Sequence, residues 1–66
     1  MDSHEKAKIR IEHWISHSEQ HQAEYEAFAD ELEKMGKAES AGFIREMTAL
    51  TAKSTECLRK SLKALG

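Results

Sequence analysis

The sequence predicts an all-α fold, a two-helix antiparallel hairpin. The 66-residue chain contains no proline and only three glycines, so it lacks most of the residues that end helices or form the turns of sheets. Its apolar residues recur every three or four positions in two stretches, one on each side of Gly36. That period is typical of one face of a helix. A chain of this length has room for one small core, so we expect a single domain over residues 1–66.

The first predicted helix covers about 3–35. Its stripe keeps the three-four spacing of a heptad pattern, with Ser18 and His21 as its two polar members. The stripe consists of Ile11, Trp14, Ser18, His21, Tyr25, Phe28, Leu32 and Met35. Asp2 or Ser3 is expected to cap the start, with Asp2 and Glu5 at the spacing of a capping box. Gly36 is expected to end the helix. At 1.5 Å per residue, the helix would be about 50 Å long.

The second predicted helix covers about 38–65. Its main stripe consists of Phe43, Met47, Leu50, Ser54, Cys57, Ser61 and Leu65. The stripe is widened on one side by Ile44, Thr51, Leu58 and Leu62. Gly42 inside this helix costs about 1 kcal/mol relative to alanine, so we expect it to allow a close approach of the two backbones near the turn.

The connection around Gly36 is only a few residues long, which makes the two helices antiparallel neighbours. Residues that face each other should then have numbers that sum to about 74 by this geometry. The register places Phe28 near Met47 and His17 near Cys57.

Two helices leave the wide second stripe exposed, so the sequence predicts that two hairpins pair into a four-helix bundle. The chain is expected to be a homodimer, with a tetramer as the alternative. Basic residues gather at the open end: Lys6, Lys8, Arg10, Arg59, Lys60 and Lys63. Acidic residues gather toward the turn: Glu24, Glu26, Asp30, Glu31, Glu33, Glu39 and Glu46. Antiparallel pairing of hairpins would set each basic end against an acidic one.

Three of the four histidines, His13, His17 and His21, recur at every fourth residue. This histidine ladder stacks its imidazoles along one side of a helix. One interpretation is a transition-metal site for Zn or Ni. His17 and His21 would be its ligands, His13 or Cys57 a third, and Glu24 a carboxylate option.

The other interpretation gives the histidines no ligand. His21 would be a polar core residue that hydrogen-bonds to Ser54 or to its mate in the dimer, while His13 and His17 are solvated. Helical bundles keep such polar layers because they specify register and oligomeric state.

Known catalytic patterns do not fit this sequence. The HExxH motif of zinc proteases fails in both halves of the ladder, since Trp14 stands in place of the glutamate and Glu19 comes one position late. No Glu-x-x-His pair and no glycine-rich phosphate loop occurs. Cys57 is expected to be a buried, unreactive thiol in mid-helix. We therefore expect no enzymatic activity.

The remaining composition narrows the setting. A formal charge of −2 argues against a dedicated nucleic-acid-binding protein. No apolar run approaches the roughly 20 residues that a membrane span needs, and the first residues lack the features of a signal peptide. With a single cysteine, the chain is expected to be cytoplasmic.

The segment Ile11–Tyr25 carries the pattern His-Trp-Ile-x-His-x-x-x-His. In this it resembles a small uncharacterised family of bacterial and archaeal helical-hairpin domains, and the likeness extends over most of the chain. The resemblance implies that His13, Trp14, His17 and His21 form a shared motif. It implies no particular activity.

The function expected from these observations is that of a non-enzymatic helical protein that self-associates and carries an accessory histidine site. The first alternative is a transition-metal-binding protein that uses the ladder. The second is an adaptor whose second helix binds a larger protein partner.

Overall fold

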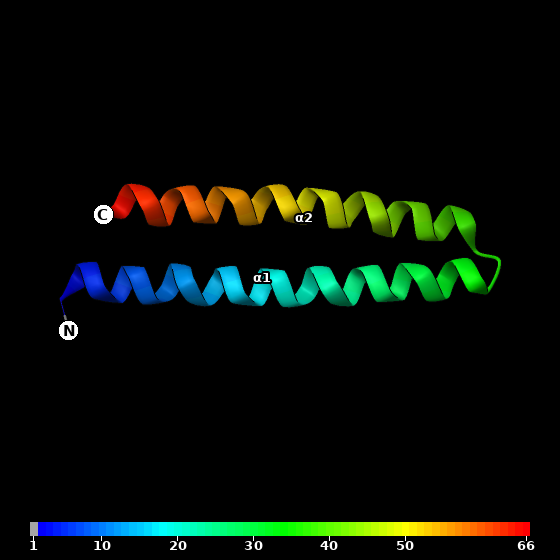
Figure 1. Cartoon of the computed structure of the whole chain (residues 1–66), viewed down its shortest axis with the longest axis horizontal. Helices are drawn as coiled ribbons and strands as arrows, with labels where there is room; N and C mark the ends of the chain where they lie inside the picture. The colour runs from blue at the N-terminus through cyan, green and yellow to red at the C-terminus, as the bar shows by residue number, and fades with distance from the viewer. Residues whose placement is uncertain (1) are drawn as a thin grey trace.

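The computed structural model describes residues 2–66 as two α-helices, α1 (Ser3–Lys34) and α2 (Ala38–Leu65), which lie side by side and antiparallel (Figure 1). The hairpin measures 51 × 17 × 10 Å, and both chain ends lie at the same end of the rod (Figure 1). The predicted hairpin is confirmed, with helix ends within one residue of those expected. Over residues 2–66, neither helix is long and apolar enough to cross a membrane.

Of the two residues predicted to cap the start of α1, Asp2 is the N-cap. The backbone N–H of Glu5 donates to Asp2 Oδ1 at 2.8 Å, which satisfies one of the N–H groups that a helix start leaves without a partner. In the same turn, His4 Nε2 donates to the backbone oxygen of Gly66 at 2.8 Å. This bond joins the first turn of α1 to the last turn of α2, where carbonyl groups lack helical partners.

The end of α1 is a Schellman motif centred on Gly36. This glycine has a φ of +78°, a left-handed conformation that side chains disfavour. The N–H of Gly36 donates to the carbonyl of Glu33 at 3.0 Å, and the N–H of Lys37 donates to that of Leu32 at 2.8 Å. The predicted stop at Gly36 is therefore confirmed, and it reverses the chain within three residues.

The two helices meet along a narrow seam, formed by the residues that are not exposed. In α1 the seam consists of Ala7, Ile11, Ile15, Ser18, Gln22, Tyr25, Ala29 and Leu32. In α2 it consists of Ala41, Ile44, Thr48, Thr51, Thr55, Leu58, Leu62 and Leu65. Both sets alternate three- and four-residue steps almost throughout, as heptad packing requires. Among residues 2–66 the fully buried apolar side chains are Ala29 and Ala41, so the helices approach most closely where side chains are small.

Half of the predicted stripe of α1 is confirmed, since Ile11, Ser18, Tyr25 and Leu32 lie in the seam, and the other half is wrong. Trp14 and Phe28, expected inside, are about half exposed, and His21 and Met35 are exposed as well. The residues that follow Trp14, His21 and Phe28 lie in the seam instead. They are Ile15, Gln22 and Ala29. A seam only two helices wide covers a narrow strip, so it favours small side chains that let the backbones approach over aromatic rings that would hold them apart.

In α2 the same correction applies. Phe43, Met47 and Leu50, expected to lead the core stripe, are exposed, and so is Cys57. The four residues that were expected only to widen the stripe belong to the seam. The axial register was nevertheless correct. The Ser18–Thr55 contact, for example, joins residues whose numbers sum to 73.

The middle of the seam is polar. The hydroxyl oxygens of Ser18 and Thr55 lie 2.5 Å apart, and Thr55 Oγ1 lies 3.1 Å from Gln22 Oε1 and 3.0 Å from the carbonyl oxygen of Thr51. Thr55 has one hydrogen to donate, to Gln22 or to Thr51, so Ser18 donates to Thr55. This layer replaces the expected His21–Ser54 pair, since both of those residues are exposed.

We expect Thr55→Val to lower the free energy of unfolding by about 1–2 kcal/mol. The change keeps the shape of a side chain that is 1% exposed but leaves the hydroxyl of Ser18 and the amide of Gln22 without their partner. Thr48→Val is the matched control, because the hydroxyl of Thr48 bonds only to the carbonyl of Ile44 in its own helix. Urea denaturation of both variants measures the difference. Equal stabilities would contradict the importance of the polar layer.

Gly42 does not mark a close approach of the backbones, which corrects the prediction. It is exposed, and a Cβ added there would meet nothing within 4 Å. The close approach falls at Ala41 next to it. We expect Gly42→Ala to raise the free energy of unfolding by up to about 1 kcal/mol, because alanine restricts the unfolded chain and favours helix.

Gly36→Ala should act in the opposite direction. Here too a Cβ would meet nothing, but the φ of +78° is unfavourable for alanine by about 1–2 kcal/mol. Thermal unfolding followed by circular dichroism compares the two variants. A stabilised Gly36→Ala variant would show that the turn does not need its left-handed residue.

Candidate functional site

The histidine ladder forms a continuous stack on α1. The ring centroids of His13 and His17 lie 4.8 Å apart, and those of His17 and His21 lie 5.6 Å apart with the rings nearly perpendicular. Tyr25 continues the stack, parallel to His21 at 5.9 Å. All three imidazoles are exposed. The predicted stacking of the ladder is thus confirmed, whereas the expected placement of His21 in the core is wrong.

Glu24 is the carboxylate partner of the ladder. The Nδ1–H of His21 donates to Glu24 Oε1 at 3.1 Å, one helical turn away. The bond assigns the hydrogen of the neutral ring to Nδ1 and leaves Nε2 as the ring's available acceptor. Glu24 therefore orients a histidine in this structure, whereas the sequence suggested it as a direct ligand.

Cys57 carries an exposed thiol, which corrects the expectation of a buried one. Within the described part of the chain, residues 2–66, no three His, Cys, Asp or Glu side chains gather into a group that could hold a metal ion. The predicted set of His13, His17, His21, Cys57 and Glu24 is therefore not assembled by one chain in this conformation. Metal binding by these residues stays a prediction.

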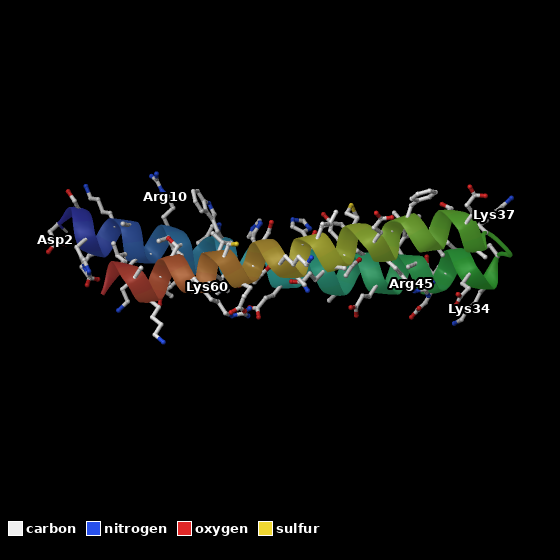
Figure 2. The ribbon with its side chains drawn as sticks, turned by 90° about the horizontal axis from the view of Figure 1, so that it is seen from above. Asp2, Arg10, Lys34, Lys37, Arg45 and Lys60 are labelled. Atoms are coloured by element: carbon white, nitrogen blue, oxygen red, sulfur yellow. The ribbon has the colours of Figure 1, made fainter. Side chains whose placement is uncertain are left out.

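The two long edges of the hairpin differ in chemistry. Arg45, Asp30 and Glu33 each follow a seam residue by one position, and they pair with one another across the helices. Positions after seam residues in both helices therefore lie along one edge, and positions before seam residues lie along the other. Figure 2 shows this division for Arg45, which follows Ile44 and projects from one long edge, and for Arg10, which precedes Ile11 and projects from the opposite one.

The edge formed by the positions before seam residues is the apolar edge. It displays the large side chains of Trp14, Phe28, Phe43, Met47 and Leu50, and Met35 continues it at the heptad spacing of α1 beyond the last seam residue. Two members of the ladder, His17 and His21, precede Ser18 and Gln22 and so lie on the same edge. These two imidazoles and the exposed apolar side chains therefore lie along the same edge, with Glu24 between His21 and Phe28.

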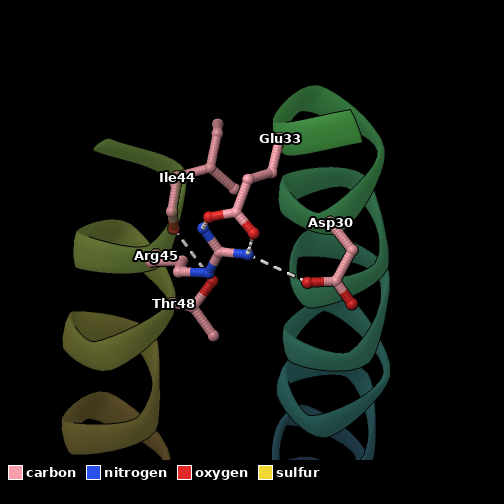
Figure 3. A network of polar contacts seen from close by, with 5 residues as sticks. All are labelled: Asp30, Glu33, Ile44, Arg45 and Thr48. Carbon is pink, nitrogen blue, oxygen red and sulfur yellow. Dashed lines mark hydrogen bonds and ion pairs between the residues drawn. The ribbon is translucent and has the colours of Figure 1, made fainter. Parts of the chain in front are cut away.

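The polar edge is closed by ion pairs. Arg45 donates to Asp30 at 2.9 Å and to both oxygens of Glu33 at 3.2 and 3.3 Å (Figure 3). The hydrogen bond to Asp30 is the main reason that the pKa of Arg45 is raised above its ordinary value. Farther toward the open end, Arg59 donates to Glu19. A shallow groove between these pairs is lined by the paired Asp30 and Arg45 and by the side chains of Gln22, Glu26, Thr48, Ala49 and Ala52.

Comparison with known proteins identifies a family for this chain. A family described as a domain of unknown function, DUF8180, matches residues 7–65. The chain belongs to this family. The DUF8180 match includes α1 from residue 7 onward, all of α2, the whole ladder and the six large apolar side chains of the apolar edge, and it leaves His4 outside. No curated protein and no solved structure matches the chain.

Sequence reasoning missed the polar layer of Ser18, Gln22 and Thr55. A signal for it was present, since Ala41, Thr48, Thr55 and Leu62 recur every seventh residue. Larger apolar residues stand next to this heptad. A prediction based on hydrophobicity alone gives those larger residues more weight and assigns them to the core.

Proposed function

We propose that this DUF8180 chain is a non-enzymatic self-association domain, in which two copies pair through their apolar edges into a four-helix bundle. The observation that carries the proposal is the apolar edge itself, whose six large side chains are 36–66% exposed. Only two alanines are fully buried apolar residues among those described. Exposed apolar surface of this extent is typical of a protein interface.

The exposed surface area of the hairpin supports an interface with a partner. The hairpin exposes 5063 Å², whereas a compact monomer of 7.5 kDa is expected to expose about 4200 Å². The excess of about 800 Å² equals the area that each partner typically contributes to a stable interface. A second copy packed along one edge would remove surface of this size.

Charge complementarity favours a second copy as that partner. Residues 2–18 and 56–66, the half with the open end, carry six basic and four acidic side chains, a net charge of +2. Residues 19–55, the half with the turn, carry four basic and eight acidic side chains, a net charge of −4. In an antiparallel dimer each half faces the opposite sign, which favours association with a like chain.

The proposal assigns no catalysis to the ladder. Over residues 2–66, no hydrogen bond joins a histidine to a serine or cysteine side chain, as activation of a nucleophile would require. Among these residues, the one hydrogen bond made by a ladder side chain joins His21 to Glu24. Metal binding by a single chain also has less support than self-association, because its donors do not gather into a group of three.

Sedimentation equilibrium over a series of chain concentrations tests the proposal. We expect a mass of twice 7.5 kDa that falls toward the monomer value on dilution. A monomer at every concentration would overturn homodimerisation and would favour the adaptor alternative, in which another protein covers the apolar edge.

A further inference from the structure

We propose that two copies of this chain share one divalent transition-metal site, of the kind that Zn²⁺ occupies, formed by His17 and His21 of each copy. This inference rests on the self-association proposed above. One chain supplies only half of the donors, so the site is complete only in the dimer.

The first argument is the position of the ladder along the rod. The midpoint of α1 (Ser3–Lys34) falls between residues 18 and 19. At 1.5 Å per residue, His17 and His21 lie about 2 and 4 Å from it along the axis. A two-fold axis through the middle of the rod sets His17 at the level of residue 20 of the other copy, and His21 at the level of residue 16. All four imidazoles then lie within about 4 Å of the two-fold axis, measured along the rod.

This convergence belongs to the antiparallel pairing that the charges favour. Its two-fold axis runs across the rod, so α1 of one copy lies over α1 of the other and ladder meets ladder. In a parallel dimer the axis would run along the rod, and α1 of one copy would lie over α2 of the other.

The second argument is the face on which the rings lie. His17 and His21 stand on the apolar edge, one position before the seam residues Ser18 and Gln22. Their ring centroids are 5.6 Å apart on successive turns of the helix. Two imidazoles at this spacing can both reach one ion at the usual Zn–N distance of about 2.0–2.1 Å.

The third argument is the hydrogen bond between His21 and Glu24. The Nδ1–H of His21 donates to Oε1 of Glu24 at 3.1 Å, and Tyr25 stacks against the ring. Metal-binding histidines almost always donate their second ring nitrogen to an oxygen in this way, which fixes the tautomer and raises the basicity of the ligating nitrogen. Glu24 is therefore a positioning residue, and Nε2 of His21 is available to a metal.

The chemistry of the donors selects the ion. Four neutral imidazoles, two from each copy, supply the tetrahedral coordination that structural zinc sites require. A single chain brings only one such pair onto its apolar edge, which agrees with the lack of a three-residue metal group within residues 2–66. The large apolar side chains on the same edge would keep water from the site in the dimer.

Calorimetric titration of the full chain with ZnCl₂ tests the stoichiometry, and sedimentation with EDTA or ZnCl₂ tests the linkage. We expect one Zn²⁺ per two chains. The dimer should become about a hundredfold tighter when free Zn²⁺ reaches a hundred times its dissociation constant, because an ion bound only by the dimer stabilises it by mass action.

Three variants assign the ligands. His17→Ala and His21→Ala should each abolish zinc binding without unfolding the chain, since both side chains are exposed. Glu24→Gln should weaken binding about 10–100-fold, as loss of an outer carboxylate does. His4→Ala is the matched control and should bind zinc as the parent does, because His4 bonds to the last turn of α2 at the far end of the rod.

The outcomes separate this inference from the proposed function. A dimer in EDTA that takes up no zinc overturns the shared site and leaves self-association in place. A monomer both in EDTA and in zinc overturns both. One Zn²⁺ bound per monomeric chain shows that a single ladder suffices, and so contradicts the shared site.

Discussion

The Phe43→Ser variant is expected to be monomeric at chain concentrations where the parent forms a dimer. Phe43 is 65% exposed in a single hairpin, so its loss should leave the packing of α1 on α2 unchanged. Burial of a phenylalanine side chain stabilises by about 1.5–3 kcal/mol, and a symmetric interface contains the residue twice. The expected loss of about 3–6 kcal/mol per dimer weakens association more than a hundredfold. Sedimentation equilibrium measures the change directly.

Ile9→Ser is the control for this experiment. Ile9 is also a large, exposed apolar residue, but it lies two positions from the seam residues Ala7 and Ile11 and so faces away from α2. Its replacement costs similar helix propensity and similar hydrophobicity without touching the apolar edge. We expect Ile9→Ser to dimerise as the parent does. Equal weakening by both variants would mean that association is unspecific and does not use the apolar edge.

Ala29→Leu is expected to lower the free energy of unfolding by about 1–3 kcal/mol and the Tm by roughly 5–20 °C. Ala29 is fully buried between the two helices, so a larger side chain there has to displace its neighbours. Leucine there would force the backbones apart and lengthen the distance that the bond between Ser18 and Thr55 must span. Thermal unfolding by circular dichroism at a fixed chain concentration measures the effect.

Ala27→Leu provides the matched comparison in the same helix. Ala27 lies two positions from Ala29, is exposed, and faces away from α2. Alanine and leucine have similar helix propensities, so the free energy of unfolding should change by less than about 0.5 kcal/mol. Equal stability of the Ala29→Leu and Ala27→Leu variants would contradict tight packing of the two helices around Ala29.

Much of the fold could be predicted because it depends on neighbours in the sequence. The N-cap at Asp2 and the stop at Gly36 each follow from residues within one or two helical turns, and both are confirmed. The antiparallel arrangement and the axial register follow from the length of the turn alone. These features need no knowledge of which face of a helix is buried.

The rotation of each helix about its axis could not be predicted in the same way. Trp14 and Phe28 in α1 and Phe43 in α2 are large apolar residues. A prediction based on hydrophobicity alone places them between the helices. The structure places Ala29, Ala41 and Thr55 there, because two helices gain more from close approach along small side chains than from separating to enclose rings. Large side chains need a second layer of helices to cover them.

The candidate site shows the same division. The four-residue spacing of the histidines predicted their stacking, and the ring distances of 4.8 and 5.6 Å confirm it. Their exposure, and the role of Glu24 as a hydrogen-bond partner of His21, depended on which face α2 covers.

The amino-acid sequence by itself determined two helices, their ends, their antiparallel course and the regular spacing of the imidazoles, since each is set by local backbone preferences or by chain length. Only the tertiary structure decided which stripe lies inside and which forms the apolar edge. The physical reason is that the predicted and the observed stripe differ by one residue, about 100° around the helix, at Trp14, His21 and Phe28 of α1 and over most of α2. The choice between them depends on how closely two backbones can pack.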